Sequence, residues 1–365
     1  MNNDIKSMYI HIPFCKHICS YCDFCKMFYN EELVNKYLEE LQKEVLSKYK
    51  GEELDTLYIG GGTPSALNLS QLGKLFEIIK TFNSSSHLEF TFEMNVVDIN
   101  EEILIFLKNN KVNRISIGIE TVNDKFLSLL ERNHTKDEVL DKIEMVKKYF
   151  NNINVDFMYA FPNQTMDDLK SDLEFFKKLD VSHISIYSLI LEENTKLYIN
   201  GTEPIDDILE SNMYYYIIKY LKNIGYNHYE ISNFSKEGYS SRHNLTYWNN
   251  EKYYGFGLGA GGYVAGVRYS NTRSINHYLK GNYCLEKDNI TKKIDMENEM
   301  ILGLRKMEGA STIKFFDKYQ VNIKDVFKIN DLLDKGILKI KNNYIYIAEE
   351  YLYLSNQILT RFIDI

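Results

Sequence analysis

The chain has 365 residues, of which 44% are hydrophobic and 26% charged, and its formal net charge is −8 at pH 7. These values are those of an ordinary soluble globular protein with one large and one small domain, and the acidic balance argues against nucleic acid as the main partner. No run approaches the roughly 18 apolar residues of a membrane span, and the first residues lack the basic and apolar regions of a secretory signal.

Strand-like and helical segments alternate through the first two thirds of the chain. Runs rich in Ile, Val, Tyr or Phe predict six strands, at 8–12, 57–60, 88–93, 114–119, 153–158 and 183–191. Apolar residues at helical spacing predict helices between them, at 31–48, 70–82, 101–109, 136–150 and 165–178. Strands separated by helices imply a parallel sheet, which is either open and doubly wound or a partial barrel.

The pattern changes after residue 200. Residues 201–290 are less regular, with Gly-rich and Tyr-rich turns. Helices are then predicted at 297–304, 311–319 and 325–335, strands at 337–340 and 344–347, and a last helix at 354–362. Three helices followed by a strand pair is the order of a winged helix. Residues 291–365 carry 12 Lys or Arg against 11 Asp or Glu, without the basic excess of a DNA-binding face. A small docking domain is therefore favoured.

Four of the five cysteines lie within 11 residues near the N-terminus, and Cys284 stands alone. Cys15, Cys19 and Cys22 have the spacing C-x3-C-x2-C, so one loop supplies three thiolates to a 4Fe-4S cluster and leaves the fourth iron open to a small molecule. Cys25 adds a second C-x2-C pair, and a compact four-thiolate zinc site is the alternative. Clustered thiols without long-range partners indicate a reducing compartment, hence the cytoplasm.

Polar residues follow several predicted strands at the ends where parallel sheets bind ligands. The turn at 60–63, Gly-Gly-Gly-Thr, lets the backbone approach a ligand closely. Glu93 ends the third strand, Glu120 ends the fourth and Asp156 lies within the fifth. One such acid is usually a solvated cap or an ion-pair partner, but three at equivalent positions are expected to share one mouth.

A second distinctive segment, Ser-Arg-His-Asn-Leu-Thr-Tyr-Trp at 241–248, holds His243 and the only Trp, and glycines follow at 255–262. A His beside aromatic residues is usually a packed, hydrogen-bonded side chain. The alternative is a ligand to iron. A haem site needs an axial nitrogen, a rim cation and an aromatic or Gly-lined slot, which His243, Arg242, Tyr247 and Trp248 together supply.

Seven parts of the chain resemble one known family. They are YIHIPFCKHICSYCDF at 9–24, GGGTPS at 60–65, NRISIGIE at 113–120, DFMYAFPNQT at 156–165, HISIYSLILEENTKLY at 183–198, HYEISNFSKEGYSSRHNLTYW at 228–248 and the winged C-terminus. Together they resemble the HemW-type haem chaperones, which belong to the radical S-adenosylmethionine, oxygen-independent coproporphyrinogen III oxidase-like family. The likeness spans nearly the whole chain.

The resemblance implies an α/β fold: a partial (β/α)6 radical S-adenosylmethionine barrel at 1–235, a connecting region at 236–294, and a winged-helix-like α+β domain at 295–365. It implies a 4Fe-4S cluster on Cys15, Cys19 and Cys22, with S-adenosylmethionine as second cofactor and haem as cargo. The family's S-adenosylmethionine positions fall on Tyr9, Tyr21, Gly61, Gly62, Thr63, Glu93, Glu120, Arg132 and Asp156. His243 is the expected haem-binding residue.

Some positions depart from the family pattern. The family commonly has Gln where Glu120 stands, Ser at Thr121 and Pro at Val96, and many members have a His in the Gly-rich turn, where this chain has none. The coproporphyrinogen-oxidising branch has its extra Cys at the position of Phe24, whereas Cys25 comes one residue later here. That branch also has a substantial segment before the cluster, for which a motif beginning at residue 9 leaves no room. These differences, and the HNxxYW motif, favour the chaperone branch.

The leading interpretation is therefore a cytoplasmic haem chaperone that delivers haem to acceptor enzymes. Respiratory and membrane-associated enzymes are the candidate acceptors, peripheral membrane contact and a homodimer are candidate arrangements, and no nucleic acid is expected. The alternative is an oxygen-independent coproporphyrinogen III oxidase, which converts propionates to vinyl groups by radical decarboxylation. A DNA-binding iron–sulfur sensor is a third hypothesis, which the charge of the C-terminal region disfavours.

Overall fold

The computed structural model describes residues 5–363. The expected absence of a signal segment rests partly on residues 1–4, which lie outside the described residues. A 12-stranded sheet has the order β14-β13-β12-β11-β1-β4-β5-β6-β7-β8-β10-β9. The six predicted strands form its centre and run parallel: β1 (Ser7–Ile12), β4 (Leu54–Gly61), β5 (Ser84–Asn95), β6 (Arg114–Glu120), β7 (Asn152–Tyr159) and β8 (His183–Ser188). Within residues 5–363 the edge strands β14 and β9 do not pair with each other, as in a partial barrel, so the expected fold class is confirmed.

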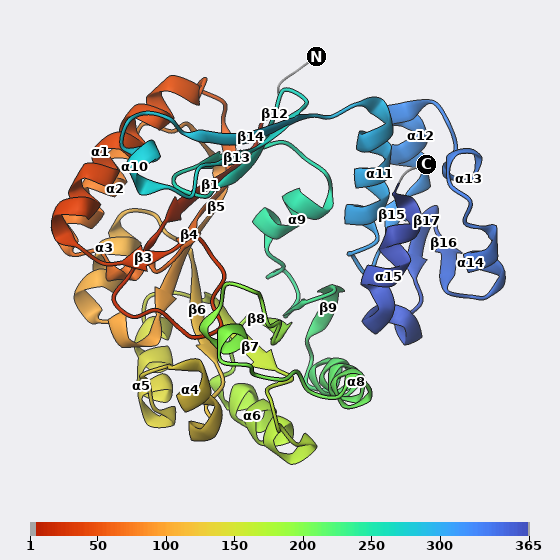
Figure 1. Cartoon of the computed structure of the whole chain (residues 1–365), viewed down its shortest axis with the longest axis horizontal. Coiled ribbons are helices and arrows are strands. Elements are labelled where there is room, and N and C mark those ends of the chain that lie inside the picture. The colour runs from red at the N-terminus through yellow and green to blue at the C-terminus, as the bar shows by residue number, and fades with distance from the viewer. Residues whose placement is uncertain (1–4, 364–365) are drawn as a thin grey trace.

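Helices cover the outer face of the curved sheet (Figure 1). The five predicted helices are α1 (Glu31–Lys48), α2 (Leu69–Ile79), α3 (Glu101–Asn109), α5 (Lys136–Lys147) and α6 (Met166–Leu179), joined by the short α4 (Asp124–Leu130), which the sequence pattern did not predict. In α1, the Asn30 side chain accepts a hydrogen bond from the Leu33 N–H, which caps the first turn. The buried face of α1 repeats at helical spacing through Val34, Leu38, Leu41 and Val45.

The region 201–290, expected to be less regular than the preceding part of the chain, contains regular elements that the sequence pattern did not predict. After α7 (Lys196–Ile199) come α8 (Asp207–Asn223), β9 (Asn227–Glu230), β10 (Asn233–Ser235), α9 (Arg242–Trp248), β11 (Tyr253–Phe256), β12 (Gly261–Val264), β13 (Val267–Asn271), α10 (Ile275–Tyr278) and β14 (Cys284–Asn289). Aromatic residues have modest helix propensity, which hid α8 in a Tyr-rich sequence. Its packing face, at Met213, Tyr214, Ile217 and Leu221, holds it against the sheet. β11 pairs parallel with β1, so the later strands extend the same sheet.

A winged-helix-like unit follows, and Figure 1 shows it beside the barrel, with α9 between the two. It contains α11 (Lys292–Gly303), β15 (Ala310–Ser311), α12 (Thr312–Tyr319), α13 (Ile323–Val326), α14 (Asn330–Asp334), β16 (Leu338–Lys341), β17 (Tyr344–Ile347) and α15 (Ser355–Leu359). The single helix predicted at 325–335 is wrong because Phe327 is extended (φ −107°, ψ 131°). That conformation buries its ring between Phe315 and Phe362. The three strands form an antiparallel sheet.

Two apolar clusters support this architecture. The larger runs through the sheet, its helices and the C-terminal unit. The smaller contains Phe126, Leu130, Met158 and Phe161. Tyr21 of the cysteine loop packs against this cluster, which therefore supports the loop. Within residues 5–363, none of the helices combines the length and apolar character needed to cross a bilayer.

Candidate functional site

The cysteine loop is closed at its base by two short strands. β2 (Phe14–Cys15) and β3 (Met27–Phe28) pair in parallel. The Met27 N–H donates to the Pro13 carbonyl at 2.7 Å, and the Tyr29 N–H donates to the Cys15 carbonyl at 2.9 Å. The two ends of the cysteine loop are therefore held side by side by the β2–β3 pair, which keeps its thiols close together.

The middle of the loop is tied to helices at the barrel mouth. The Ser20 N–H donates to the Leu130 carbonyl at 3.2 Å, and the Ser20 hydroxyl donates to the Leu129 carbonyl at 2.7 Å. The Leu197 N–H in turn donates to the Ser20 carbonyl at 3.1 Å. Because both ends and the middle are held, the loop is positioned by contacts far apart in sequence.

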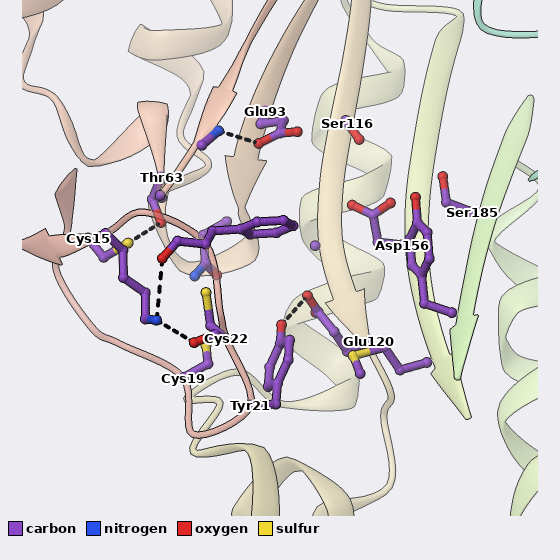
Figure 2. A pocket seen from close by; sticks show the side chains of 18 of the residues that line it. Cys15, Cys19, Tyr21, Cys22, Thr63, Glu93, Ser116, Glu120, Asp156 and Ser185 are labelled. Carbon is purple, nitrogen blue, oxygen red and sulfur yellow. Dashed lines mark hydrogen bonds between the residues drawn. The ribbon is translucent and has the colours of Figure 1, made fainter. Parts of the chain in front are cut away.

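Three thiols of this loop face one cavity of about 460 Å³; Figure 2 shows Cys15, Cys19 and Cys22 along one of its walls. Cys15 Sγ accepts a hydrogen bond from Thr63 Oγ1 at 3.4 Å, and Arg132 Nη1 donates to Cys19 Sγ at 3.6 Å. Burial raises the pKa of Cys15 to about 11 and also raises the pKa values of Cys19 and Cys22. These thiols hold their protons at neutral pH unless a metal displaces them.

Cys25 is set apart from these three. It does not line the cavity, and its Sγ would lie 2.9 Å from a Cβ placed on Gly259. Burial raises the pKa of its thiol, which the nearby Arg273 guanidinium opposes. Across the described residues, no three His, Cys, Asp or Glu side chains converge on one metal-ion position.

The glycine turn after β4 forms the next wall. Gly61 has φ +124°, a conformation that favours glycine. A Cβ on Gly62 would lie 2.8 Å from the Pro13 carbonyl carbon and 2.9 Å from Cys15 Sγ. The missing side chains therefore let this turn lie directly against the cysteine loop, and Thr63 completes the wall.

Glu93 faces the cavity from the end of β5. Its carboxylate accepts hydrogen bonds from the Tyr58 hydroxyl at 2.7 Å and from the Gly61 N–H at 3.1 Å. Burial raises the pKa of Glu93 to about 7, against the lowering effect of the Tyr58 hydrogen bond, and the charge of Asp156 adds to the rise. Near neutral pH the Glu93 carboxyl is therefore close to the midpoint of its titration.

Glu120 and Arg132 form a buried ion pair beside the cysteines. Glu120 Oε2 lies 2.7 Å from Arg132 Nη2, and Oε1 accepts from the Tyr21 hydroxyl at 2.8 Å; Figure 2 shows the Tyr21 contact. Glu120 has φ +64°, so its backbone turns as β6 ends. Burial raises the pKa of Glu120, and the Arg132 charge opposes that effect.

Asp156 lies across the cavity on β7, and Asn154 Nδ2 donates to it at 3.0 Å. Burial raises the pKa of Asp156. The structure thus brings the three carboxylates predicted from the strand ends into one cavity with the thiols. Their roles toward a cofactor stay a prediction.

Sequence reasoning missed several polar residues that line the same cavity: Tyr58, Arg114, Ser116, Asn154, Ser185, Tyr187 and Asn244. Many of them stand at alternate positions of otherwise apolar strands, as Arg114 and Ser116 do on β6. Residues at i and i+2 of a strand share a face. A polar face of period two inside the barrel was therefore readable from the sequence.

Two predicted site residues do not line the cavity. The Tyr9 hydroxyl lies 2.9 Å from His11 Nδ1, on β1. His243 is 1% exposed, with Nδ1 2.8 Å from Thr56 Oγ1 and Nε2 2.7 Å from the Tyr247 hydroxyl. Burial lowers the pKa of His243 to about 3. Both ring nitrogens are engaged, so binding to iron would require His243 to give up at least one hydrogen bond; the ligand role stays a prediction.

The neighbours of His243 point in different directions. Arg242 is exposed, and its guanidinium donates to the His87 carbonyl at 2.5 Å. The Trp248 ring stacks on the Arg305 guanidinium at 4.6 Å, which joins α9 to the C-terminal unit. The Gly257 N–H donates to Glu44 of α1 at 2.9 Å. The motif thus packs α9 against the C-terminal unit through Trp248, and His243 is a packed, hydrogen-bonded side chain in this structure.

Comparison with known proteins places this site in a family. A sequence model of the radical SAM superfamily matches residues 9–176. A protein of Lactococcus lactis named haem chaperone HemW is 41% identical over 98% of this chain and 97% of its own, and one of that name from Bacillus subtilis is 37% identical over 98% and 99%. The solved coproporphyrinogen III oxidase HemN of Escherichia coli, a radical SAM enzyme, superposes with a TM-score of 0.87 at 18% identity over 99% of this chain and 91% of its own.

The barrel, the cysteine loop and these matches define the class: the chain belongs to the radical S-adenosylmethionine superfamily. Within it, the chain belongs to the family of the haem chaperone HemW, because relatives that are 33–41% identical over 91–99% of both sequences carry that name. The likeness to HemN concerns the fold.

Proposed function

We propose that this protein is a haem chaperone that carries a 4Fe-4S cluster and S-adenosylmethionine and transfers haem to acceptor proteins in the cytoplasm. The observation that carries the proposal is the single cavity in which three thiols, a side-chain-free glycine turn and three buried carboxyls meet. The names of the relatives supply the cargo. The division of the chain at 235 and 294, peripheral membrane contact, a homodimer and membrane-associated respiratory acceptors remain parts of this proposal.

Cys15, Cys19 and Cys22 would hold the cluster, which supplies an open iron site to a small-molecule ligand. The Gly61–Gly62 backbone would receive the amino-acid end of S-adenosylmethionine. Glu93 and Asp156 would accept hydrogen bonds from its polar groups, because buried carboxylates favour such donors and a nearby cation. The Glu120–Arg132 pair would keep the wall beside Cys19 rigid.

An apolar rim gives a flat cargo somewhere to rest. Phe24 and Ile190 line the cavity, and their side chains are 69% and 65% exposed. Exposed large apolar side chains at a cavity mouth mark a binding surface. A tetrapyrrole has apolar faces and anionic propionates, which suits an apolar rim above a polar interior.

The test is anaerobic reconstitution with iron and sulfide, followed by haem titration and, in parallel, incubation with coproporphyrinogen III, S-adenosylmethionine and a reductant. We expect about four irons per chain, saturable haem binding, and no decarboxylated product above a no-protein control. Product formation would overturn the chaperone function in favour of the oxidase. A protein that takes up no cluster in this reconstitution, but binds zinc in a parallel incubation with zinc alone, would refute the cofactor assignment itself.

A further inference from the structure

The floor of the cavity carries a polar network that the proposed cofactor roles leave unused. It lies on β6, β7 and β8, where strand register sets Ser116 beside Asn154 and Asn154 beside His183. Ser116, Asn154 and Ser185 line the cavity together with Arg114; Figure 2 shows Ser116 and Ser185 on strands flanking Asp156.

Most of this network is internally satisfied. Asn154 Nδ2 donates to Ser116 Oγ at 2.8 Å, and Asn154 Oδ1 accepts from Ser185 Oγ at 3.0 Å and lies 2.6 Å from His183 Nδ1. The other ring nitrogen of His183 lies 2.7 Å from the Tyr229 hydroxyl. These groups hold one another in place and have little capacity left for a ligand.

Arg114 is the exception. Its side chain is 2% exposed, and its Nε has no hydrogen-bond partner within the described part of the chain. In contrast to Arg132, which pairs with Glu120, Arg114 forms no ion pair among residues 5–363. The Thr91 hydroxyl, in register with Arg114 on the next strand, is also buried without a partner. A buried, unpaired guanidinium is costly unless an anion joins it.

The surrounding carboxyls do not supply that anion in full. Glu93 and Asp156 are the acidic groups that interact with Arg114 across the cavity. Burial raises the pKa of both carboxyls, and to about 7 for Glu93, so part of the negative charge of Glu93 is absent near neutral pH. The floor therefore retains a positive potential suited to a carboxylate, which a guanidinium binds with two parallel hydrogen bonds.

We propose that Arg114 is the binding site for a tetrapyrrole propionate, with the ring held at the apolar rim of the cavity. This inference rests on the proposed function. A cavity of about 460 Å³ does not take a whole tetrapyrrole beside S-adenosylmethionine, but a propionate arm is only a few atoms long. Met94 and Met158 also line the cavity, so its wall offers apolar contacts as well as the buried Arg114 cation.

The experiment compares haem, its dimethyl ester and coproporphyrin III in equilibrium binding to the cluster-loaded protein. The variants are Arg114→Gln and Arg114→Lys, with Arg361→Gln as control, since Arg361 is exposed and pairs with Asp331 in the C-terminal unit. We expect the parent and the control to bind haem at least tenfold more tightly than the ester. Arg114→Gln should lose at least tenfold in haem affinity but bind the ester as the parent does, which also reports that it is folded.

Each outcome decides. Haem binding to Arg114→Gln within twofold of the parent, or equal discrimination against the ester in both proteins, overturns the propionate site while leaving haem binding intact. If Arg114→Gln does not fold, Arg114→Lys replaces it, because a lysine keeps the charge but loses the two-pronged geometry; ester discrimination as strong as in the parent would then count against the site. If the parent binds coproporphyrin III but not haem, the chaperone function is refuted, and the propionate site is then tested by binding of coproporphyrin III to the Arg114 variants. If the parent binds neither ligand, both the chaperone function and the propionate site are refuted.

Discussion

Glu93 makes the stability of the protein depend on pH in a predictable direction. Its pKa is about 7 in the folded protein, against about 4.3 for an unperturbed Glu. The folded state therefore binds more protons than the unfolded state between these values. Stability should fall as pH rises through this window, because ionising the buried carboxyl becomes a cost borne by the native state alone.

The size of this effect follows from the two pKa values. They give a loss of roughly 2.5 kcal/mol between pH 5 and pH 8. Glu93 borders the cavity, and water there weakens the burial effect, so we expect about 1–2 kcal/mol. Glu93→Gln removes the titration, since an amide of the same shape stays neutral. The free energy of unfolding of the variant minus that of the parent should therefore rise by about 1–2 kcal/mol from pH 5 to pH 8.

The assay is urea unfolding of cluster-free protein, kept reduced, at pH 5, 6.5 and 8. Glu102→Gln is the matched control, because Glu102 is exposed on α3. The neighbouring Asp156 titrates in every protein compared, so its effect largely cancels in the differences. The reasoning would be contradicted if the difference in the free energy of unfolding between parent and variant stayed constant with pH, or if the parent gained stability relative to the variant as pH rises.

Three further outcomes are expected. Cys22→Ala should abolish the cluster absorbance of reconstituted protein, whereas Cys25→Ala should retain it because that sulfur packs against Gly259; loss in both would show that four thiols are needed. Glu93→Ala should weaken S-adenosylmethionine binding about 30- to 150-fold, the equivalent of roughly 2–3 kcal/mol, and an affinity within threefold of the parent by calorimetry would count against its role. His243→Ala should lower the free energy of unfolding by about 2–4 kcal/mol, since two buried hydrogen bonds are lost; a tenfold loss of haem affinity in the folded variant would support its ligand role instead.

Local sequence patterns were sufficient for the centre of the fold. Runs rich in Ile, Val, Tyr or Phe predicted the six strands, and helical spacing predicted the helices between them, with α1 and α3 at their observed bounds. These signals are local, because a strand or helix buries one face whose spacing is set by its own geometry. Patterns failed where tertiary packing dominates: α8 is a Tyr-rich helix held by its buried face, and Phe327 breaks a predicted helix to bury its ring.

By itself, the sequence determined the three-thiol motif, the glycine turn and the carboxyls at the strand ends, because spacing along the chain fixes which groups are available. Only the tertiary structure decided where they point. Cys22 faces the cavity and Cys25 does not, although they are three residues apart, because the loop that carries both is held at Ser20 and at its two ends by distant segments. His243 meets Thr56 across 187 residues, and Arg114 is buried with an Nε atom that has no hydrogen-bond partner within residues 5–363. Such outcomes depend on long-range contacts, which no local spacing encodes.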